Sequence, residues 1–152
     1  MRILLATHNK GKVEEFQEAL KPYDIQIVSA DAANIQEPEE TGTTFHENAE
    51  LKARAAFAAT GMPTLADDSG LCVNALGGDP GIYSARWAGP DRDFKLAMDK
   101  VQDRLGDNPD RSAAFVCVLA YIDETGQSRF YEGRVQGNII WPPRGLDGFG
   151  YD

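Results

Sequence analysis

The sequence has 152 residues, of which 42% are hydrophobic and 26% charged. This composition excludes a disordered or collagen-like chain, and the length is enough for one domain, residues 1–152, with a core that needs no disulfide bonds. The formal net charge of −9 opposes a broad DNA-, RNA- or lipid-binding surface. Because no apolar run approaches the ~18 residues of a membrane span, we expect a cytoplasmic protein.

The first third of the chain predicts a strand, a helix and a second strand. The apolar run at residues 3–6 is typical of a short buried strand, and the polar segment THNKGK follows it as a loop. Apolar residues at helical spacing predict a helix over 13–20, which Pro22 ends. Alternating apolar residues then predict a strand over 24–29.

The next segment predicts an acidic loop followed by a second helix. Residues 34–42 are rich in glutamate around a proline, which indicates a loop. Thr44 and Glu47 have the T-x-x-E spacing of a capping box, so a helix begins there. Gly61, followed closely by a proline, ends it.

The second half predicts more strands and one long helix. Residues 63–73 indicate a strand broken by a tight turn at Asp-Asp-Ser-Gly. An apolar stripe predicts a helix over 94–105. Residues 113–122 and 129–140 predict an antiparallel hairpin. The whole pattern indicates an α/β fold with a mixed sheet.

The first candidate site is the segment between the first strand and the first helix. A helix N-terminus offers free amides and the positive end of a dipole, and two lysines with a glycine add charge and close backbone approach. The residues are Thr7, His8, Asn9, Lys10, Gly11 and Lys12. They suit phosphate binding, although the segment lacks the spacing of a P-loop and a solvated turn is the alternative.

The second candidate site is acidic. Glu37, Glu39 and Glu40 surround a proline, and Asp67 and Asp68 follow a predicted strand. Magnesium in proteins prefers a few carboxylates together with waters and phosphates, and a carboxylate can also deprotonate an attacking water. The alternative is that these side chains are solvated or cap a turn. Their occurrence with a lysine-bearing loop in one small domain favours a nucleotide site.

Other features carry weaker signals. Cys72 and Cys117 show no C-x-x-C spacing, so we expect buried free thiols rather than a redox or zinc site. His8 and His46 have no partner pattern and are expected to face solvent. Arg86, which follows a glycine- and proline-rich loop, could reach a phosphate.

Together these segments resemble the inosine triphosphate pyrophosphatase family, also called the Ham1 or RdgB-like NTP pyrophosphatases. Several long motifs in the family's order are far more specific than any one of them, and they cover nearly the whole chain. In chain order they are ATHNKGKVEEF at 6–16, EETGTTFHENAELKA at 39–53, LADDSGL at 65–71, LGGDPGIYSARWAG at 76–89 and GFGYD at 148–152.

The resemblance implies a two-lobed α/β fold with a long mixed sheet flanked by helices, a homodimer, and a cleft that binds a nucleotide. It implies that Glu40 and Asp68 bind Mg²⁺ and that Asp68 is the catalytic carboxylate. Residues Thr7 to Lys12 would hold the triphosphate, with Lys52 facing the phosphates and Ser69 touching substrate. The base and sugar pocket would be lined by Phe149, Gly150, Tyr151 and Asp152.

The implied activity is hydrolysis of ITP, dITP and XTP to the monophosphate and pyrophosphate, with Mg²⁺ as cofactor. Replacing Asp68 by Asn should nearly abolish turnover with little effect on folding. The mechanism requires residues Asn9 to Lys12 to lie against the Asp-Asp-Ser corner, because an acidic protein binds a polyanion only where positive groups converge.

The sequence also departs from the family. Relatives continue beyond GFGYD with more sheet and helix, a substrate-binding lysine and a Ser-His-Arg motif, and these are not present here. We therefore expect a chain truncated at its C-terminus with exposed apolar surface. A catalytically impaired nucleotide-binding fragment is the main alternative. A hydrolase that releases orthophosphate is another, and an RNA-binding domain is disfavoured by the charge.

Overall fold

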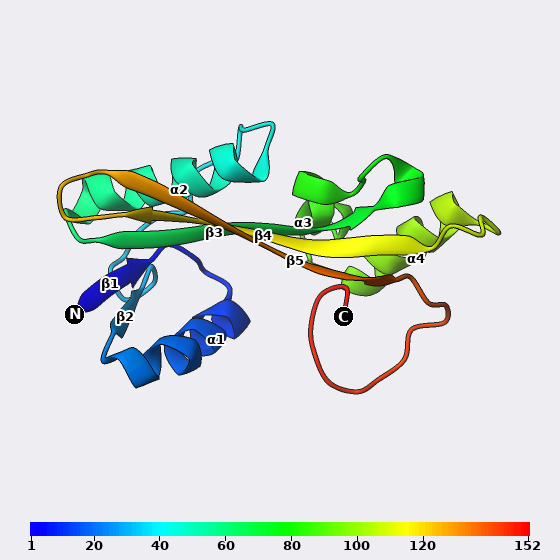
Figure 1. Cartoon of the computed structure of the whole chain (residues 1–152), viewed down its shortest axis with the longest axis horizontal. Helices are drawn as coiled ribbons and strands as arrows, with labels where there is room; N and C mark the ends of the chain where they lie inside the picture. Colours follow the sequence, from blue (N-terminus) through cyan, green and yellow to red (C-terminus); the bar gives the residue numbers. More distant parts are fainter. The chain divides into compact units, whose positions relative to one another are not determined.

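The computed structural model describes all residues, 1–152, which form two compact units. The first unit comprises residues 1–68 and 118–132, and the second comprises 69–117 and 133–152. The strands are β1 (Arg2–Leu5), β2 (Gln26–Ser29), β3 (Thr64–Val73), β4 (Ser112–Ile122) and β5 (Ser128–Asn138). The helices are α1 (Lys10–Leu20), α2 (Phe45–Thr60), α3 (Ser84–Trp87) and α4 (Phe94–Leu105), with short 3₁₀ turns between them (Figure 1).

The strands form one mixed sheet in the order β2-β1-β3-β4-β5. Strand β1 pairs in parallel with both β2 and β3, with Leu4 opposite Val28 on one side and opposite Thr64 on the other. The link from β4 to β5, residues 123–127, is too short for a parallel crossover, so these neighbours are antiparallel. The α/β fold with a mixed sheet predicted from the sequence is confirmed.

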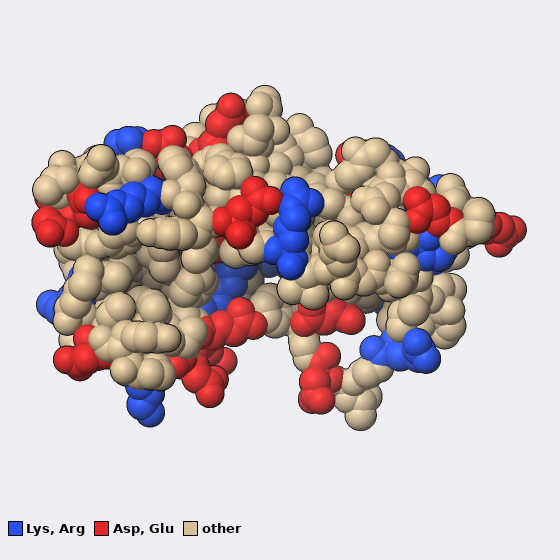
Figure 2. Space-filling model, viewed as in Figure 1, with Lys and Arg blue, Asp and Glu red and all other residues tan.

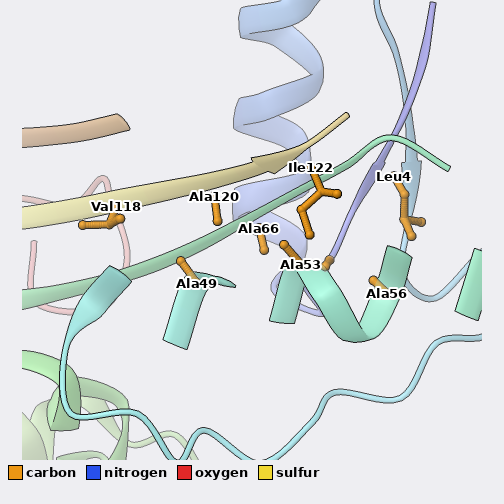
Figure 3. Close-up of a cluster of buried hydrophobic side chains, with 9 residues drawn as sticks. Leu4, Ala49, Ala53, Ala56, Ala66, Val118, Ala120 and Ile122 are labelled. Carbon is orange, nitrogen blue, oxygen red and sulfur yellow. The ribbon is translucent and has the colours of Figure 1, made fainter. Parts of the chain in front are cut away.

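In the first unit, helices cover both faces of the sheet. Alternate residues of a strand face opposite sides, so Leu4 points toward α2 while Ile3 and Leu5 point toward α1. Figure 3 shows the α2 side, where small side chains let the helix pack close to the strands. The residues of this cluster are Leu4, Ala6, Ala49, Ala53, Ala56, Ala66, Val118, Ala120 and Ile122.

The second unit has its own core between α4 and the sheet. Leu71 and Val73 of β3 pack with Val101 and Leu105 of α4 and with Ala113 of β4. Helix α4 has the bounds that the apolar stripe predicted. The one-turn helix α3 was not predicted. None of the helices combines the length and apolar character that crossing a bilayer would require.

Helix α2 confirms its predicted ends. The Thr44 side chain accepts a hydrogen bond from the Glu47 amide, and Gly61 takes a left-handed conformation at the other end. Helix α1, by contrast, begins at Lys10 rather than at Val13. The Asn9 side chain accepts from the Lys12 amide at 3.3 Å and caps a turn that the sequence prediction had placed in the loop.

Two strand predictions are wrong. Strand β2 begins at Gln26 rather than Asp24, because Asp24 takes a left-handed conformation with φ of 56° that no strand accommodates. Strand β3 runs without interruption from Thr64 to Val73, so residues 67–70 are extended rather than a turn. Long-range contacts of the aspartates, described below, stabilise the extended form.

We expect the variant Gly70→Ala to be destabilised by about 1–3 kcal/mol, because overpacking forces the backbone to move. A Cβ at residue 70 would lie 2.2 Å from the carbonyl oxygen of Gly81 and 2.7 Å from Ser84 Oγ. Urea unfolding measures the change. Gly137→Ala in β5 is the control, since nothing lies within 4 Å of its Cβ position. Equal stability of the two variants would contradict the close approach.

Candidate functional site

The site begins with the buried face of α2. Asn48 and Lys52 lie four residues apart and therefore share one side of the helix. Both are polar yet almost fully buried, with 1% and 7% of their surfaces exposed. Buried polar groups need partners, and these two side chains have partners in β3 and in the loop that precedes α2.

Asp67 and Asp68 occupy successive positions of β3 and are buried, with 2% and 5% exposure. Because the strand is extended there, the two carboxylates point to opposite faces of the sheet. Asp67 accepts a hydrogen bond from Lys12 Nζ of α1 at 2.6 Å, and Asp68 accepts one from Asn48 Nδ2 of α2 at 3.2 Å. The strand thus presents one carboxylate to each helix.

Lys52 connects this strand with the acidic loop. Its Nζ donates to Glu40 Oε1 at 2.6 Å, and Glu40 lies in the loop before α2. Burial lowers the pKa of Lys52, but the hydrogen bond and charge of Glu40, with the charges of Asp67 and Asp68, outweigh it and raise the pKa above its usual value. Lys52 therefore stays protonated among three carboxylates.

The surroundings of the Asp68 carboxyl group shift its pKa strongly. Burial raises its pKa from 3.8 to about 6, and the nearby charge of Glu40 adds to this rise. The Lys52 ammonium and the Asn48 hydrogen bond oppose it without cancelling it. Asp68 can therefore exchange a proton close to neutral pH, which is the property expected of a general base.

The predicted lysine loop lies against this strand, as the mechanism required. The Lys12–Asp67 hydrogen bond joins residues 55 positions apart in sequence. Thr7 is buried and its hydroxyl accepts from the Asn9 amide at 3.2 Å. His8, expected to face solvent, is half-buried and contacts Asp31 at 2.5 Å. Of the remaining loop residues, Gly11 is half-buried and Lys10 is exposed.

The structure differs from the sequence-based expectation for four residues, Asn48, Asp67, Glu37 and Glu39. Asn48 was not considered at all, although its spacing from Lys52 would have placed it on the same helix face. Asp67 was given only as a neighbour of Asp68 in a turn, whereas it is the direct partner of Lys12. Of the three glutamates grouped in the sequence, Glu37, Glu39 and Glu40, it is Glu40 that pairs with Lys52.

The predicted base-pocket segment lies in the second unit. Tyr151 donates its hydroxyl proton to the Ser84 carbonyl at 2.7 Å and packs edge-on against Phe94, and burial raises its pKa to about 12. Phe149 is 47% exposed, and its amide donates to Asp152 Oδ2 at 3.2 Å. Tyr151 and Asp152 line a largely apolar pocket with Leu71, Met98, Val101, Ala113, Phe115, Val135, Ile139, Ile140 and Trp141.

Ser69 and Gly150 are the remaining residues predicted to contact substrate. Ser69 is half-buried in β3, directly after the aspartate pair. Gly150 has φ of 65°, a left-handed conformation that glycine adopts without strain, and it lies close to the Phe94 ring. This conformation lets the chain turn between the exposed Phe149 and the half-buried Tyr151.

The weaker sequence features have mixed outcomes. Cys72 and Cys117 are free thiols as predicted, but they are half-buried rather than buried. His46 is half-exposed and lies 3.9 Å from Glu132. The Arg86 guanidinium lies over the Tyr83 ring, 5.0 Å from its centre, so the ring orients the side chain that was considered for phosphate contact.

Acidic and basic side chains are interspersed on the face drawn in Figure 2. That face carries no continuous basic area of the kind that follows a nucleic-acid backbone. The positive groups that matter for the site are Lys12 and Lys52, which are directed inward against carboxylates. This agrees with a net charge of −9, which opposes binding of a long nucleic-acid backbone.

The protein offers few side chains that could ligate a metal ion at this site. No group of three or more His, Cys, Asp or Glu side chains converges in a way that could hold a metal ion. Glu40 and Asp68, both within electrostatic reach of Lys52, are the available pair. Two carboxylates are the set that Mg²⁺ uses when waters and substrate phosphates supply its other ligands, so the residues present fit this ion.

Comparisons with known sequences agree on one family. The Ham1 family model matches residues 3–152. A dITP/XTP pyrophosphatase of Gluconobacter oxydans is 49% identical over 151 residues, which cover 99% of this chain and 73% of the relative. A protein of the same name from Bradyrhizobium is 51% identical over 156 residues, with the same coverage of both chains.

Solved structures give the same result. A Ham1 protein from Coxiella burnetii has a TM-score of 0.91 and 42% identity, covering all of this chain and 79% of that one. The Staphylococcus aureus Ham1 protein has a TM-score of 0.88 and 40% identity, with the same coverage. The resemblance drawn from the sequence motifs is therefore confirmed, and the chain belongs to the Ham1 family.

Proposed function

We propose that this protein hydrolyses non-standard purine nucleoside triphosphates, such as ITP, dITP and XTP, to the monophosphate and pyrophosphate, and so removes them from the nucleotide pool. Membership of the Ham1 family supports a nucleoside-triphosphate pyrophosphatase. We choose deaminated purines as substrates because relatives with about 50% sequence identity are named dITP/XTP pyrophosphatase.

The observation that carries the proposal is the meeting of two ammonium groups with two adjacent buried carboxylates. Lys12 contacts Asp67 directly, and the charge of Lys52 acts on both aspartates. In a protein of net charge −9, a triphosphate needs ammonium groups, backbone donors and a bound cation together to offset the negative charge around it. The first turn of α1, with Asn9 as its cap, adds backbone donors next to Lys12.

We propose Mg²⁺ as the cofactor, held by Glu40 and Asp68. When bound, this ion would supply positive charge that offsets the charge developing on the phosphate oxygens during bond cleavage. Glu40 is already directed into the site by Lys52, and Asp68 by Asn48, so the protein side chains are ordered before substrate arrives. Such ordering lowers the reorganisation needed for catalysis.

Asp68 is proposed as the catalytic carboxylate. A water attacks the α-phosphorus and its proton passes to a carboxylate oxygen of Asp68, while the bond from the α-phosphorus to the bridging oxygen breaks. The electron pair of that bond leaves with pyrophosphate. A pKa of about 6 suits this role, because a general base works best when its pKa is near the working pH. Lys12 would stabilise the leaving group with its charge.

The proposed substrate contacts outside the phosphate site are Ser69 and residues 149–152. An exposed aromatic ring such as Phe149 can stack on any base. Selection for the 6-oxo group and the N1 proton of deaminated purines needs hydrogen-bonding groups, because a mismatch then leaves buried polar atoms unpaired. The homodimer and the cytoplasmic location expected from the sequence stay predictions.

The products released from dITP and ATP in the presence of Mg²⁺ test the proposal. We expect pyrophosphate and the monophosphate from dITP, with slower turnover of ATP. Separate enzymatic assays for pyrophosphate and for orthophosphate distinguish the two kinds of hydrolase. Release of orthophosphate would assign a different reaction, and nucleotide binding without either product would assign a non-catalytic module.

A further inference from the structure

Asn48 makes two hydrogen bonds that link separate parts of the site. Its Oδ1 accepts from the backbone amide of Gly42 at 2.8 Å, in the loop that carries Glu40. Its Nδ2 donates to Asp68 Oδ2 at 3.2 Å, in strand β3. The side chain is 1% exposed, so water does not replace either partner.

The chemistry of the two partners is matched by an amide side chain at this position. The Gly42 N–H can only donate and an ionised carboxylate can only accept, so the bridging side chain must present one acceptor and one donor. Aspartate would lack the donor and leucine would lack both. This requirement also fixes the orientation of the Asn48 amide, with its oxygen toward the loop and its nitrogen toward Asp68.

The loop that carries Glu40 is bonded closely to the start of α2. The Thr43 amide and hydroxyl both donate to Glu47 Oε2, at 2.6 and 3.0 Å, so two successive loop residues bond to the first turn of α2. A Cβ at Gly42 would lie 2.5 Å from Asn48 Oδ1 and 2.7 Å from Glu47 Cβ. The loop therefore fits against Asn48 with no space for a larger residue at position 42.

We propose that Asn48 is a positioning residue that fixes the Glu40-bearing loop relative to Asp68 and thereby sets the separation of the two carboxylates that hold the divalent cation. The inference rests on the proposed function, since it assigns how that metal site is built. Asn48 itself acts through its neighbours. Residues that orient metal ligands typically change affinity by about 10–100-fold when they are replaced.

The test measures cation binding without turnover. Mn²⁺ replaces Mg²⁺ as the probe, and electron paramagnetic resonance of the free ion gives its dissociation constant for the whole protein. We expect Asn48→Ala to weaken Mn²⁺ binding about tenfold or more. In parallel, the Mg²⁺ concentration for half-maximal dITP turnover should rise by a similar factor, with a smaller change in kcat at saturating Mg²⁺.

Thr44→Ala is the matched control. The Thr44 side chain caps the same helix turn, but its hydrogen bond is with the Glu47 amide rather than with Asp68 or Gly42. Its loss should cost about 1 kcal/mol of stability and leave Mn²⁺ affinity within about twofold of the wild type. If Asn48→Ala does not fold, Gly42→Ala displaces the loop from the other side and should weaken Mn²⁺ binding in the same direction.

The outcomes separate this inference from the proposed function. Wild-type affinity in both Asn48→Ala and Gly42→Ala, or equal weakening in Thr44→Ala, would overturn the positioning role while the metal site stands. A wild-type protein that binds no Mn²⁺ would overturn the metal site and the inference together. Weaker Mn²⁺ binding in Asn48→Ala and Gly42→Ala, with unchanged binding in Thr44→Ala, supports the proposal.

Discussion

Replacing Asp68 by Asn is expected to lower the turnover of dITP by about 10²–10⁴-fold at saturating Mg²⁺, the usual contribution of a positioned general base. Asparagine has nearly the same shape and can still accept the hydrogen bond from Asn48 Nδ2. It cannot take a proton from water and is a poorer cation ligand. The loss should therefore appear in kcat, measured as pyrophosphate release, in a protein that remains folded.

Asp99→Asn is the control for this variant. Asp99 is a half-buried residue of α4 whose carboxylate pairs with Lys95 four positions earlier, so its replacement changes the net charge by the same amount. We expect turnover close to that of the wild type. Near-normal pyrophosphate release by Asp68→Asn would remove Asp68 from the mechanism, and an equal loss in Asp99→Asn would show a nonspecific charge effect.

The parts of the fold that the sequence predicts well are those whose signals are local. Helix α2 carries its own start and stop, a threonine whose side chain caps the first turn and a glycine with φ of 67° at the end. Helix α4 likewise shows its buried stripe in the spacing of apolar residues alone. In both helices the sequence neighbours that decide the structure lie within four positions.

Strand β3 could not be predicted in the same way, because its conformation depends on distant residues. Asp-Asp-Ser-Gly is a favourable turn sequence when only local contacts count. The extended form is stabilised because Lys12, 55 residues away, bonds to Asp67, and because Asn48, 20 residues away, bonds to Asp68. A turn would have placed both carboxylates on one side, whereas the strand sends them to different helices.

The candidate site also contains some features that the sequence predicts and others that depend on tertiary contacts. The resemblance to a known family brought Glu40, Lys52 and Asp68 together, since motif order carries information that local propensity lacks. The hydrogen bond of Asn48 to Gly42 joins residues six positions apart, whereas its bond to Asp68 depends on how α2 packs against the sheet. The small alanines on the buried side of α2 allow that close packing.

Asp68→Asn is also expected to make the metal-free protein more stable above pH 6, in contrast to its effect on activity. The pKa of Asp68 is 3.8 in an exposed setting and about 6 in the folded protein. Between these values Asp68 binds more protons in the folded state than in the unfolded state. Its contribution to the free energy of unfolding therefore falls as pH rises from about 4 to about 6 and is then constant. Asparagine removes this loss, which amounts to about 2–3 kcal/mol.

Urea unfolding in the presence of EDTA, repeated from pH 4 to pH 8, measures this effect. The difference between Asp68→Asn and the wild type should be near zero at pH 4 and reach its full value by about pH 7. Parallel curves across the whole range would mean that Asp68 titrates normally in the folded protein. That result would also remove the argument for Asp68 as a base that works near neutral pH.

The variant Lys52→Met tests whether Asp68→Asn is stabilised by the loss of a charge or by the loss of any buried polar group. Methionine keeps most of the apolar stem but removes the ammonium that Glu40, Asp67 and Asp68 share. At pH 8 the metal-free variant should lose about 3 kcal/mol, because three carboxylates then lack their common cation. The loss should shrink toward pH 4, because Asp68, whose pKa is raised to about 6, then takes up a proton. If repulsion between carboxylates governs the stability of this site, then at pH 8 the free energy of unfolding must rise in Asp68→Asn and fall in Lys52→Met. A rise in both variants would instead attribute the instability of the site to the burial of polar groups.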